Sequence, residues 1–145
     1  MNAYVDSSVL IKLYVLELDS QAAVDSVSRY PAVPATPLHE LEIRNAFRVL
    51  HGHDIISAAQ RASSEHLFER DLLASRLRRT VPDWSEAFRI SLSISSEYAS
   101  ETLARSLDIL HVAIAMSIGT NIFVTADRRQ LEIARRMSLS GELID

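Results

Sequence analysis

Short apolar segments alternate along the chain with longer segments in which apolar residues recur every three or four positions. The recurrence is typical of helices with one apolar face, and the short segments are typical of buried strands. We expect helices at Ser7–Leu16, Ser20–Tyr30, Leu38–His51, Ile55–Leu77, Trp84–Tyr98, Ser106–Ile118 and Arg128–Met137. We expect strands at Asn2–Val5, Ala32–Thr36, Arg79–Val81, Asn121–Thr125 and Leu139–Leu143.

This order of strands and helices predicts the α/β fold class. We expect a mainly parallel central sheet with helices on both faces, which is a three-layer α/β/α sandwich. The length of 145 residues suits one domain that covers 1–145. In such folds, ligands bind outside the carboxyl ends of the strands. Polar residues that directly follow strands are therefore candidate site residues.

Two aspartates occupy such positions. Asp6 follows the first strand, and Asp127 follows the strand Asn121–Thr125. An aspartate directly before a helix is also a common N-cap, because its carboxylate accepts hydrogen bonds from the first backbone N–H groups. Taken singly, both residues fit either interpretation.

Two further acids lie on faces that should be buried. On the helix Leu38–His51, positions 38, 41, 42, 45, 46 and 49 form a largely apolar face that includes Glu42. The helix Ser106–Ile118 is apolar nearly all round, and Asp108 and His111 are its main polar interruptions. The helix dipole alone would also explain Asp108, since it lies in the first turn.

Convergence of the four acids would be costly, because desolvation and like-charge repulsion both disfavour ionised carboxylates. Divalent cations offset that cost, and oxygen ligands suit Mg²⁺ or Mn²⁺. The formal charge of −4 equals the charge of these four acids, and the absence of cysteine excludes a zinc–thiolate site. We therefore expect a Mg²⁺ (or Mn²⁺) site made of Asp6, Glu42, Asp108 and Asp127.

Three segments carry a family resemblance: YVDSSVLIKLY, TPLHELEIRNAF and SLDILHVAIAMSIGTNIFVTAD. With these acids in this order, the chain resembles PIN-domain proteins, in particular the VapC-type toxins of bacterial toxin–antitoxin pairs. The resemblance runs from residue 2 to residue 142 and is weak over 53–100. The four family acids match Asp6, Glu42, Asp108 and Asp127, so the resemblance implies an intact catalytic set and a PIN-like fold.

The resemblance implies a metal-dependent endoribonuclease that leaves 5′-phosphate and 3′-hydroxyl ends. Asp6, Asp108 and Asp127 are then direct or water-mediated metal ligands, and Glu42 binds a second metal or orients the attacking water. We expect Ser7 and Thr125 to hold carboxylates in place, unless they are ordinary capping and strand hydroxyls. Asn45 follows Glu42 by one turn and is a candidate polar neighbour of the site. Arginines near the site elements are candidate phosphate contacts, namely Arg44, Arg48, Arg128 and Arg129.

The resemblance also implies two protein partners: a second copy of the chain in a homodimer, and a small VapB-like antitoxin that covers the acidic site. The apolar helix Trp84–Tyr98 offers a surface for such contacts, although its apolar residues would also suit a core. We find no signal peptide and no apolar segment near the ~20 residues that a membrane span needs. We therefore expect a cytoplasmic protein with no membrane partner.

Other functions remain open from the sequence. A phosphatase with an aspartyl nucleophile would need Asp-x-Asp after the first strand, where this chain has Asp6-Ser7-Ser8. A receiver-like Mg²⁺-binding module would need adjacent early acids and a late lysine, but Lys12 is the only lysine. A non-catalytic PIN fold and a housekeeping PIN nuclease are both compatible with the pattern. His111 is expected to be structural, bonded to a neighbouring side chain, and a catalytic histidine is the alternative.

Overall fold

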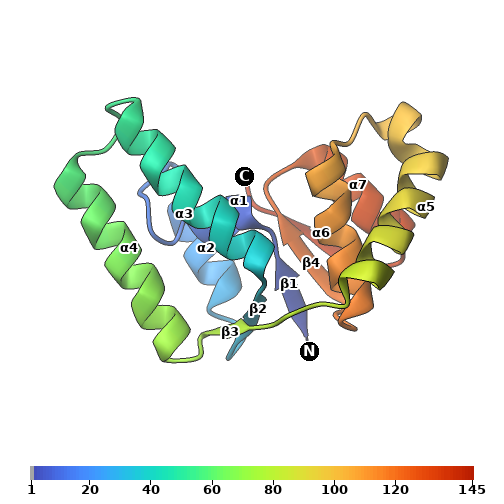
Figure 1. Cartoon of the computed structure of the whole chain (residues 1–145), viewed down its shortest axis with the longest axis horizontal. Helices are drawn as coiled ribbons and strands as arrows, with labels where there is room; N and C mark the ends of the chain where they lie inside the picture. Colours follow the sequence, from blue (N-terminus) through green and yellow to red (C-terminus); the bar gives the residue numbers. More distant parts are fainter. Residues whose placement is uncertain (1) are drawn as a thin grey trace. The chain divides into compact units, whose positions relative to one another are not determined.

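Helices alternate with short parallel strands throughout the computed structural model, which describes residues 2–145 (Figure 1). The chain divides into two compact units. The first unit contains the N-terminal residues through Asp6 together with Val81–Asp145, and the second unit is Ser7–Thr80. The α/β class with parallel strands is confirmed, and the strands form two sheets, one in each unit.

The first unit is built on a three-stranded parallel sheet. Its strands are β1 (Ala3–Val5), β4 (Ile122–Thr125) and β5 (Ser140–Leu143), in the order β1-β4-β5. Its helices are α5 (Trp84–Thr102), α6 (Ser106–Ser117) and α7 (Arg128–Arg136). Helix α7 connects β4 to β5 and packs on both strands, while α6 packs against α5 and α7.

The register of β1 and β4 brings two candidate acids to one edge of this sheet. Val5 pairs with Val124, and the backbone N–H of Asp6 donates to the Val124 carbonyl at 2.9 Å. Both strands therefore end at the same edge, where Asp6 follows β1 and Asp127 follows β4. Helix α6 is buried from Ile109 through Ala115, which confirms the prediction of a helix that is apolar nearly all round.

The second unit pairs four helices with a two-stranded parallel sheet. Its helices are α1 (Ser7–Ile11), α2 (Ser20–Val27), α3 (Pro37–Gly52) and α4 (Ala58–Leu73). Its strands are β2 (Val33–Ala35) and β3 (Leu77–Arg79), with Val33 paired to Leu77. Tyr14, Phe47 and Phe68 contact one another edge to face and form the centre of its core.

Several predicted boundaries in this unit are wrong. Helix α1 ends at Ile11 rather than Leu16, because the next residues continue as tight turns. Helix α4 begins after Ser57, whose side chain and that of Gln60 form a capping box. It ends at Leu73, and Ser75 then adopts a positive φ of 58°. The chain therefore enters β3 at Leu77, where the sequence suggested helix, and not at Arg79.

The predicted apolar face of α3 is also wrong. The buried residues of α3 are His39, Ile43 and Phe47, which lie one turn apart on a narrow stripe. Leu41 and Val49, which belong to the predicted face, are 66% and 46% exposed. Glu42 borders the buried stripe and is half-buried.

None of the helices described over residues 2–145 has the length and apolarity needed to cross a bilayer.

Candidate functional site

Asp6 is a buried carboxylate at the end of β1. It is 6% exposed, and its Oδ1 accepts a hydrogen bond of 3.2 Å from the Gln130 side-chain amide. The same oxygen lies 3.6 Å from Nε2 of His111. An ionised carboxylate at this depth needs such donors, because burial removes the water that would otherwise solvate it.

His111 connects β1 to α6 inside the first unit. It is 1% exposed, and its Nδ1 lies 2.6 Å from the Tyr4 hydroxyl. Its other nitrogen faces Asp6, so both ring nitrogens face polar partners. These contacts agree with the expected structural role of His111, although its neighbours are Tyr4 and Asp6 rather than a residue one turn away.

Asp127 caps α7. Its Oδ1 accepts hydrogen bonds from the backbone N–H groups of Arg129 at 2.8 Å and Gln130 at 3.1 Å. The Asp127 N–H donates to the Thr125 hydroxyl at 3.0 Å. The N-cap interpretation of Asp127 is therefore correct, and the Thr125 hydroxyl helps to fix this turn through the Asp127 backbone. Capping does not exclude a second role for the carboxylate.

Asp108 lies half-buried in the first turn of α6. Burial raises the pKa of its carboxyl, and the charges of Asp127 and Asp6 raise it further. His111 and a backbone hydrogen bond from Arg105 partly offset that rise in pKa. Asp108 is thus close enough to Asp6 and Asp127 for their charges to disfavour its ionisation.

Asp6, Asp108 and Asp127 do not form a ready-made metal cage. Over residues 2–145, no three His, Cys, Asp or Glu side chains are grouped closely enough for that. The donors nevertheless fit a hard cation, because they are carboxylate oxygens. The Asp6 carboxylate is buried, and the Asp108 carboxylate is partly desolvated and repelled by the charges of Asp127 and Asp6. A divalent cation would neutralise this repulsion and draw the side chains together.

Gln130 joins these residues, and the sequence analysis missed it. Its side chain is fully buried, and its Oε1 accepts a hydrogen bond of 2.5 Å from the Thr125 hydroxyl. Its Nε2 donates to Asp6 Oδ1 and to the Asp108 carbonyl, both at 3.2 Å. The only hint in the sequence was its position, because Gln130 is a polar residue next to the apolar Leu131 and three positions after Asp127.

An open cavity of about 450 Å³ lies over Asp108 and Asp127. Basic side chains surround the two acids there, and the lining residues are Arg105, Asp108, Ala126, Asp127, Arg128 and Arg129. Arg128 is paired with Asp145 at 3.3 Å. Arg105 and Arg129 have no ion pair among the contacts described over residues 2–145. The cavity can therefore present cationic groups next to carboxylates.

The remaining predicted site residues belong to the second unit. Glu42 accepts a hydrogen bond of 2.9 Å from the hydroxyl of Ser7, the residue that follows Asp6 in the chain. The carboxylate that Ser7 contacts is therefore that of Glu42, and a role for Ser7 in the site stays a prediction. Asn45 is exposed and stays an untested candidate.

Two predicted phosphate contacts on α3 already have acidic partners. Arg44 forms ion pairs with Glu69 and Glu40, and Arg48 lies 3.8 Å from Glu65. These arginines are therefore weaker candidates for phosphate contact than Arg105 and Arg129.

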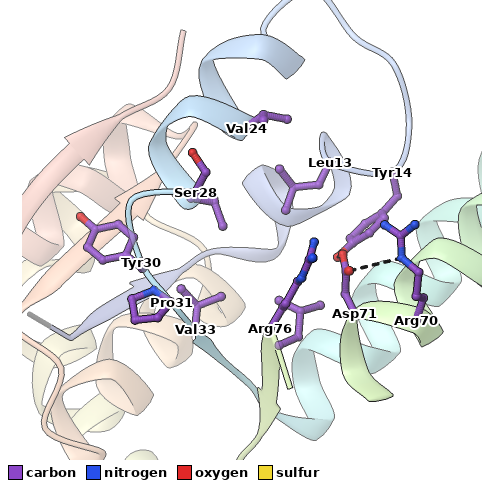
Figure 2. Close-up of a pocket in the computed structure, with 12 residues that line it drawn as sticks. Leu13, Tyr14, Val24, Ser28, Tyr30, Pro31, Val33, Arg70, Asp71 and Arg76 are labelled. Carbon is purple, nitrogen blue, oxygen red and sulfur yellow. Dashed lines mark hydrogen bonds and ion pairs between the residues drawn. The ribbon is translucent and has the colours of Figure 1, made fainter. Parts of the chain in front are cut away.

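A second cavity, of about 500 Å³, lies wholly within the second unit (Figure 2). Its walls include Leu13, Val24 and Val33, and its polar edge contains Tyr14 and Asp71. The Tyr14 hydroxyl donates to Asp71 Oδ2 at 2.8 Å. None of the four candidate acids lines this cavity.

Comparisons with known proteins agree with the observed fold. The family model of the PIN domain matches residues 3–136. The structure of VapBC2 from Rickettsia felis, bound to a DNA fragment from their promoter, has a similar chain with a TM-score of 0.67 and 13% identity. That match covers 100% of both chains. FitAcB from Neisseria gonorrhoeae gives a TM-score of 0.64 and 16% identity, over 96% of this chain and 95% of that one. No curated protein sequence is significantly similar to the chain.

Proposed function

The chain belongs to the PIN domain family, and we propose that it is a metal-dependent endoribonuclease that acts as the toxin of a VapBC-type toxin–antitoxin pair. The observation that carries this proposal is that Gln130 is hydrogen-bonded to the Asp6 and Asp127 carboxylates and to the Asp108 carbonyl, which places the three acid-bearing residues around one side chain. The fold similarity to the VapBC2 chain supports the toxin assignment.

In this proposal, Asp6, Asp108 and Asp127 hold Mg²⁺ or Mn²⁺, directly or through water. Glu42 is the fourth acid, and it binds a second metal or orients the attacking water. When bound by these residues, the cation would supply a more acidic water molecule and would offset negative charge on the phosphate. Thr125 and Ser7 restrain the carboxylate-bearing turns through the hydrogen bonds described above.

The arginines of the 450 Å³ cavity suit an RNA substrate. A phosphodiester carries negative charge, which Asp108 and Asp127 would repel if they were alone. Arg105 and Arg129 line the same cavity and can pair with phosphate oxygens in a bidentate manner. In this proposal the carboxylates bind the cation, and the guanidinium groups bind the phosphate backbone of the substrate strand. We assign these two arginines to substrate binding.

We also propose two protein partners for this function. One is a small VapB-like antitoxin, in keeping with the fold similarity to a chain of the VapBC2 structure. The other is a second copy of the chain in a homodimer. The proposed setting is the cytoplasm, where RNA substrates and an antitoxin are both accessible.

The test is cleavage of total cellular RNA by purified, antitoxin-free protein with Mg²⁺, Mn²⁺ or EDTA. Asp6→Asn is the site variant, and Asp25→Asn is the matched control, because Asp25 is an exposed residue of α2. We expect metal-dependent cleavage that falls at least about a hundredfold in Asp6→Asn and stays unchanged in Asp25→Asn.

Other outcomes would favour the alternatives. Cleavage without metal, or equal cleavage by Asp6→Asn, would contradict the proposed site. A folded protein that binds Mg²⁺ without cleaving RNA would favour a non-catalytic interaction module. Cleavage without growth arrest on expression, and without an antitoxin gene beside the coding sequence, would favour a housekeeping PIN nuclease.

A further inference from the structure

We propose that Gln130 is a positioning residue that fixes the relative placement of Asp6, Asp108 and Asp127 for cation binding. This inference rests on the metal-dependent function proposed above. Gln130 does not need to touch the metal or the RNA. It acts through the groups to which it is hydrogen-bonded.

The contacts of Gln130 reach each of the three acids. The side-chain Nε2 donates to the Asp6 carboxylate and to the backbone carbonyl of Asp108, both at 3.2 Å. The backbone N–H of Gln130 donates to the Asp127 carboxylate at 3.1 Å. One residue of α7 is therefore bonded to the end of β1, to the first turn of α6 and to its own N-cap.

The orientation of the Gln130 amide follows from its partners. The Asp6 carboxylate and the Asp108 carbonyl can only accept hydrogen bonds, so the NH₂ group must face them. Both hydrogens of Nε2 are then used. The Thr125 hydroxyl donates to Oε1 at 2.5 Å and accepts from the Asp127 N–H at 3.0 Å. A flipped amide would place Oε1 against two acceptors, so the network has one consistent arrangement.

The buried Gln130 amide depends on these hydrogen bonds, because a buried amide without partners is costly. The side chain is fully buried next to Leu131 and Ala134, where an apolar residue of similar size would avoid the cost of desolvating an amide. What the amide adds is a donor to a buried carboxylate, which restrains that carboxylate before a cation arrives. Outer partners of this kind typically change metal affinity by about 10–100-fold when removed.

The experiment is calorimetric titration of metal-free protein with Mn²⁺, with a thermal melt of each variant. Gln130→Met keeps the approximate volume and removes the amide, while Gln130→Asn keeps an amide but withdraws it by one methylene. Ile133→Val is the matched control, because Ile133 is a fully buried residue of the same helix with an apolar side chain. It should lower the melting temperature without touching the acids.

We expect the wild type and Ile133→Val to bind Mn²⁺ equally, and Gln130→Met to bind about tenfold more weakly. If Gln130→Met does not fold, Gln130→Asn carries the same comparison. Binding by Gln130→Met within twofold of the wild type would overturn the inference and leave the proposed function standing. Equal weakening in Ile133→Val would also overturn it, because general destabilisation would then explain the loss. A wild type that binds no Mn²⁺ would overturn both the inference and the proposed function.

Discussion

The Asp127 carboxylate interacts both with its own helix and with a residue of another helix. It caps α7 through Oδ1, and its charge also acts on Asp108 in the neighbouring helix α6. The two interpretations that the sequence left open for this residue are therefore compatible. They can be separated by substitution, because asparagine caps helices about as well as aspartate does.

We predict that Asp127→Asn changes the free energy of unfolding by only a few tenths of a kcal/mol, whereas Asp127→Ala lowers it by about 1 kcal/mol. Both substitutions should abolish Mn²⁺ binding. Urea denaturation measures the stabilities and calorimetry measures the binding. Retention of Mn²⁺ binding by Asp127→Asn would remove Asp127 from the metal site.

Asp108 carries an electrostatic cost in the metal-free protein. Its pKa is raised by burial and by the charges of Asp127 and Asp6. A raised folded-state pKa means that ionisation is harder in the folded protein than in the unfolded one. Asp108 therefore destabilises the fold as the pH rises through the ordinary range of an aspartate and above it.

We predict that Asp108→Asn stabilises the metal-free protein at neutral pH. The gain should be below about 1 kcal/mol, because solvent screens a half-buried charge. It should vanish at a pH at which Asp108 is protonated in both states. Melting curves in EDTA at neutral and acidic pH test this prediction, with Asp25→Asn as the exposed control. A lower melting temperature for Asp108→Asn at neutral pH would refute it.

At the residue scale, the sequence indicated candidate acids but not the residues that are hydrogen-bonded to them. Asp6 and Asp127 were recognisable because they follow strands, and Asp108 because it interrupts an apolar helix. Gln130 was not, because a glutamine is compatible with an exposed helix face, and only the tertiary fold places it between Thr125 and Asp6. The involvement of Glu42 stays a prediction, because the apolar face of α3 on which it was predicted to lie is not the buried face of that helix.

At the scale of elements, the positions of the helices and strands followed from periodicity, and their ends did not. The start of α4 was encoded by Ser57 and Gln60, a capping box that the sequence analysis did not use. The buried stripe of α3 was ambiguous, because its sequence supports two apolar stripes. Packing selected His39, Ile43 and Phe47, and left Leu41 exposed.

A hydrogen bond between Tyr14, which follows α1, and Asp71 of α4 links these two parts of the second unit (Figure 2). The Tyr14 hydroxyl donates to Asp71 Oδ2. Asp71 Oδ1 is buried without a hydrogen-bond donor among the residues described, although Arg70 Nε lies 3.7 Å away. The Tyr14 hydroxyl therefore provides much of the stabilisation of this carboxylate.

We predict that Tyr14→Phe lowers the free energy of unfolding by about 1–2 kcal/mol, because a hydrogen bond to a charged group is lost. Tyr30→Phe is the control, since Tyr30 lines the same cavity without a described hydrogen bond from its hydroxyl. Its effect should stay below about 0.5 kcal/mol. Urea denaturation provides the comparison, and equal effects of the two substitutions would contradict the assigned contact.

At the scale of the whole molecule, exposed apolar residues on α5 suit the proposed homodimer. Phe88 and Leu92 lie one turn apart on this helix and are 53% and 70% exposed. The region was predicted as a contact surface from its apolar character, with core packing as the alternative. The exposure of these two side chains favours the surface interpretation for them.

We predict a dimer of twice the chain mass of 16.2 kDa in light scattering after size exclusion. The double substitution Phe88→Ser and Leu92→Ser should shift it to monomer. Leu18→Ser is the control, because Leu18 is a fully exposed leucine of the second unit. A wild type that is monomeric at all concentrations would contradict the proposed dimer.

We propose above that Asp6, Asp108 and Asp127 together hold a divalent cation. The most direct test of this proposal is a crystal structure grown with Mn²⁺, in which anomalous scattering locates the metal. We predict an anomalous peak within about 2.5 Å of carboxylate oxygens from these residues, unless a water bridges one of them. The same map would report whether Glu42 joins them. Ordered carboxylates at this edge of the sheet, with no Mn²⁺ peak at a saturating concentration, would contradict the account.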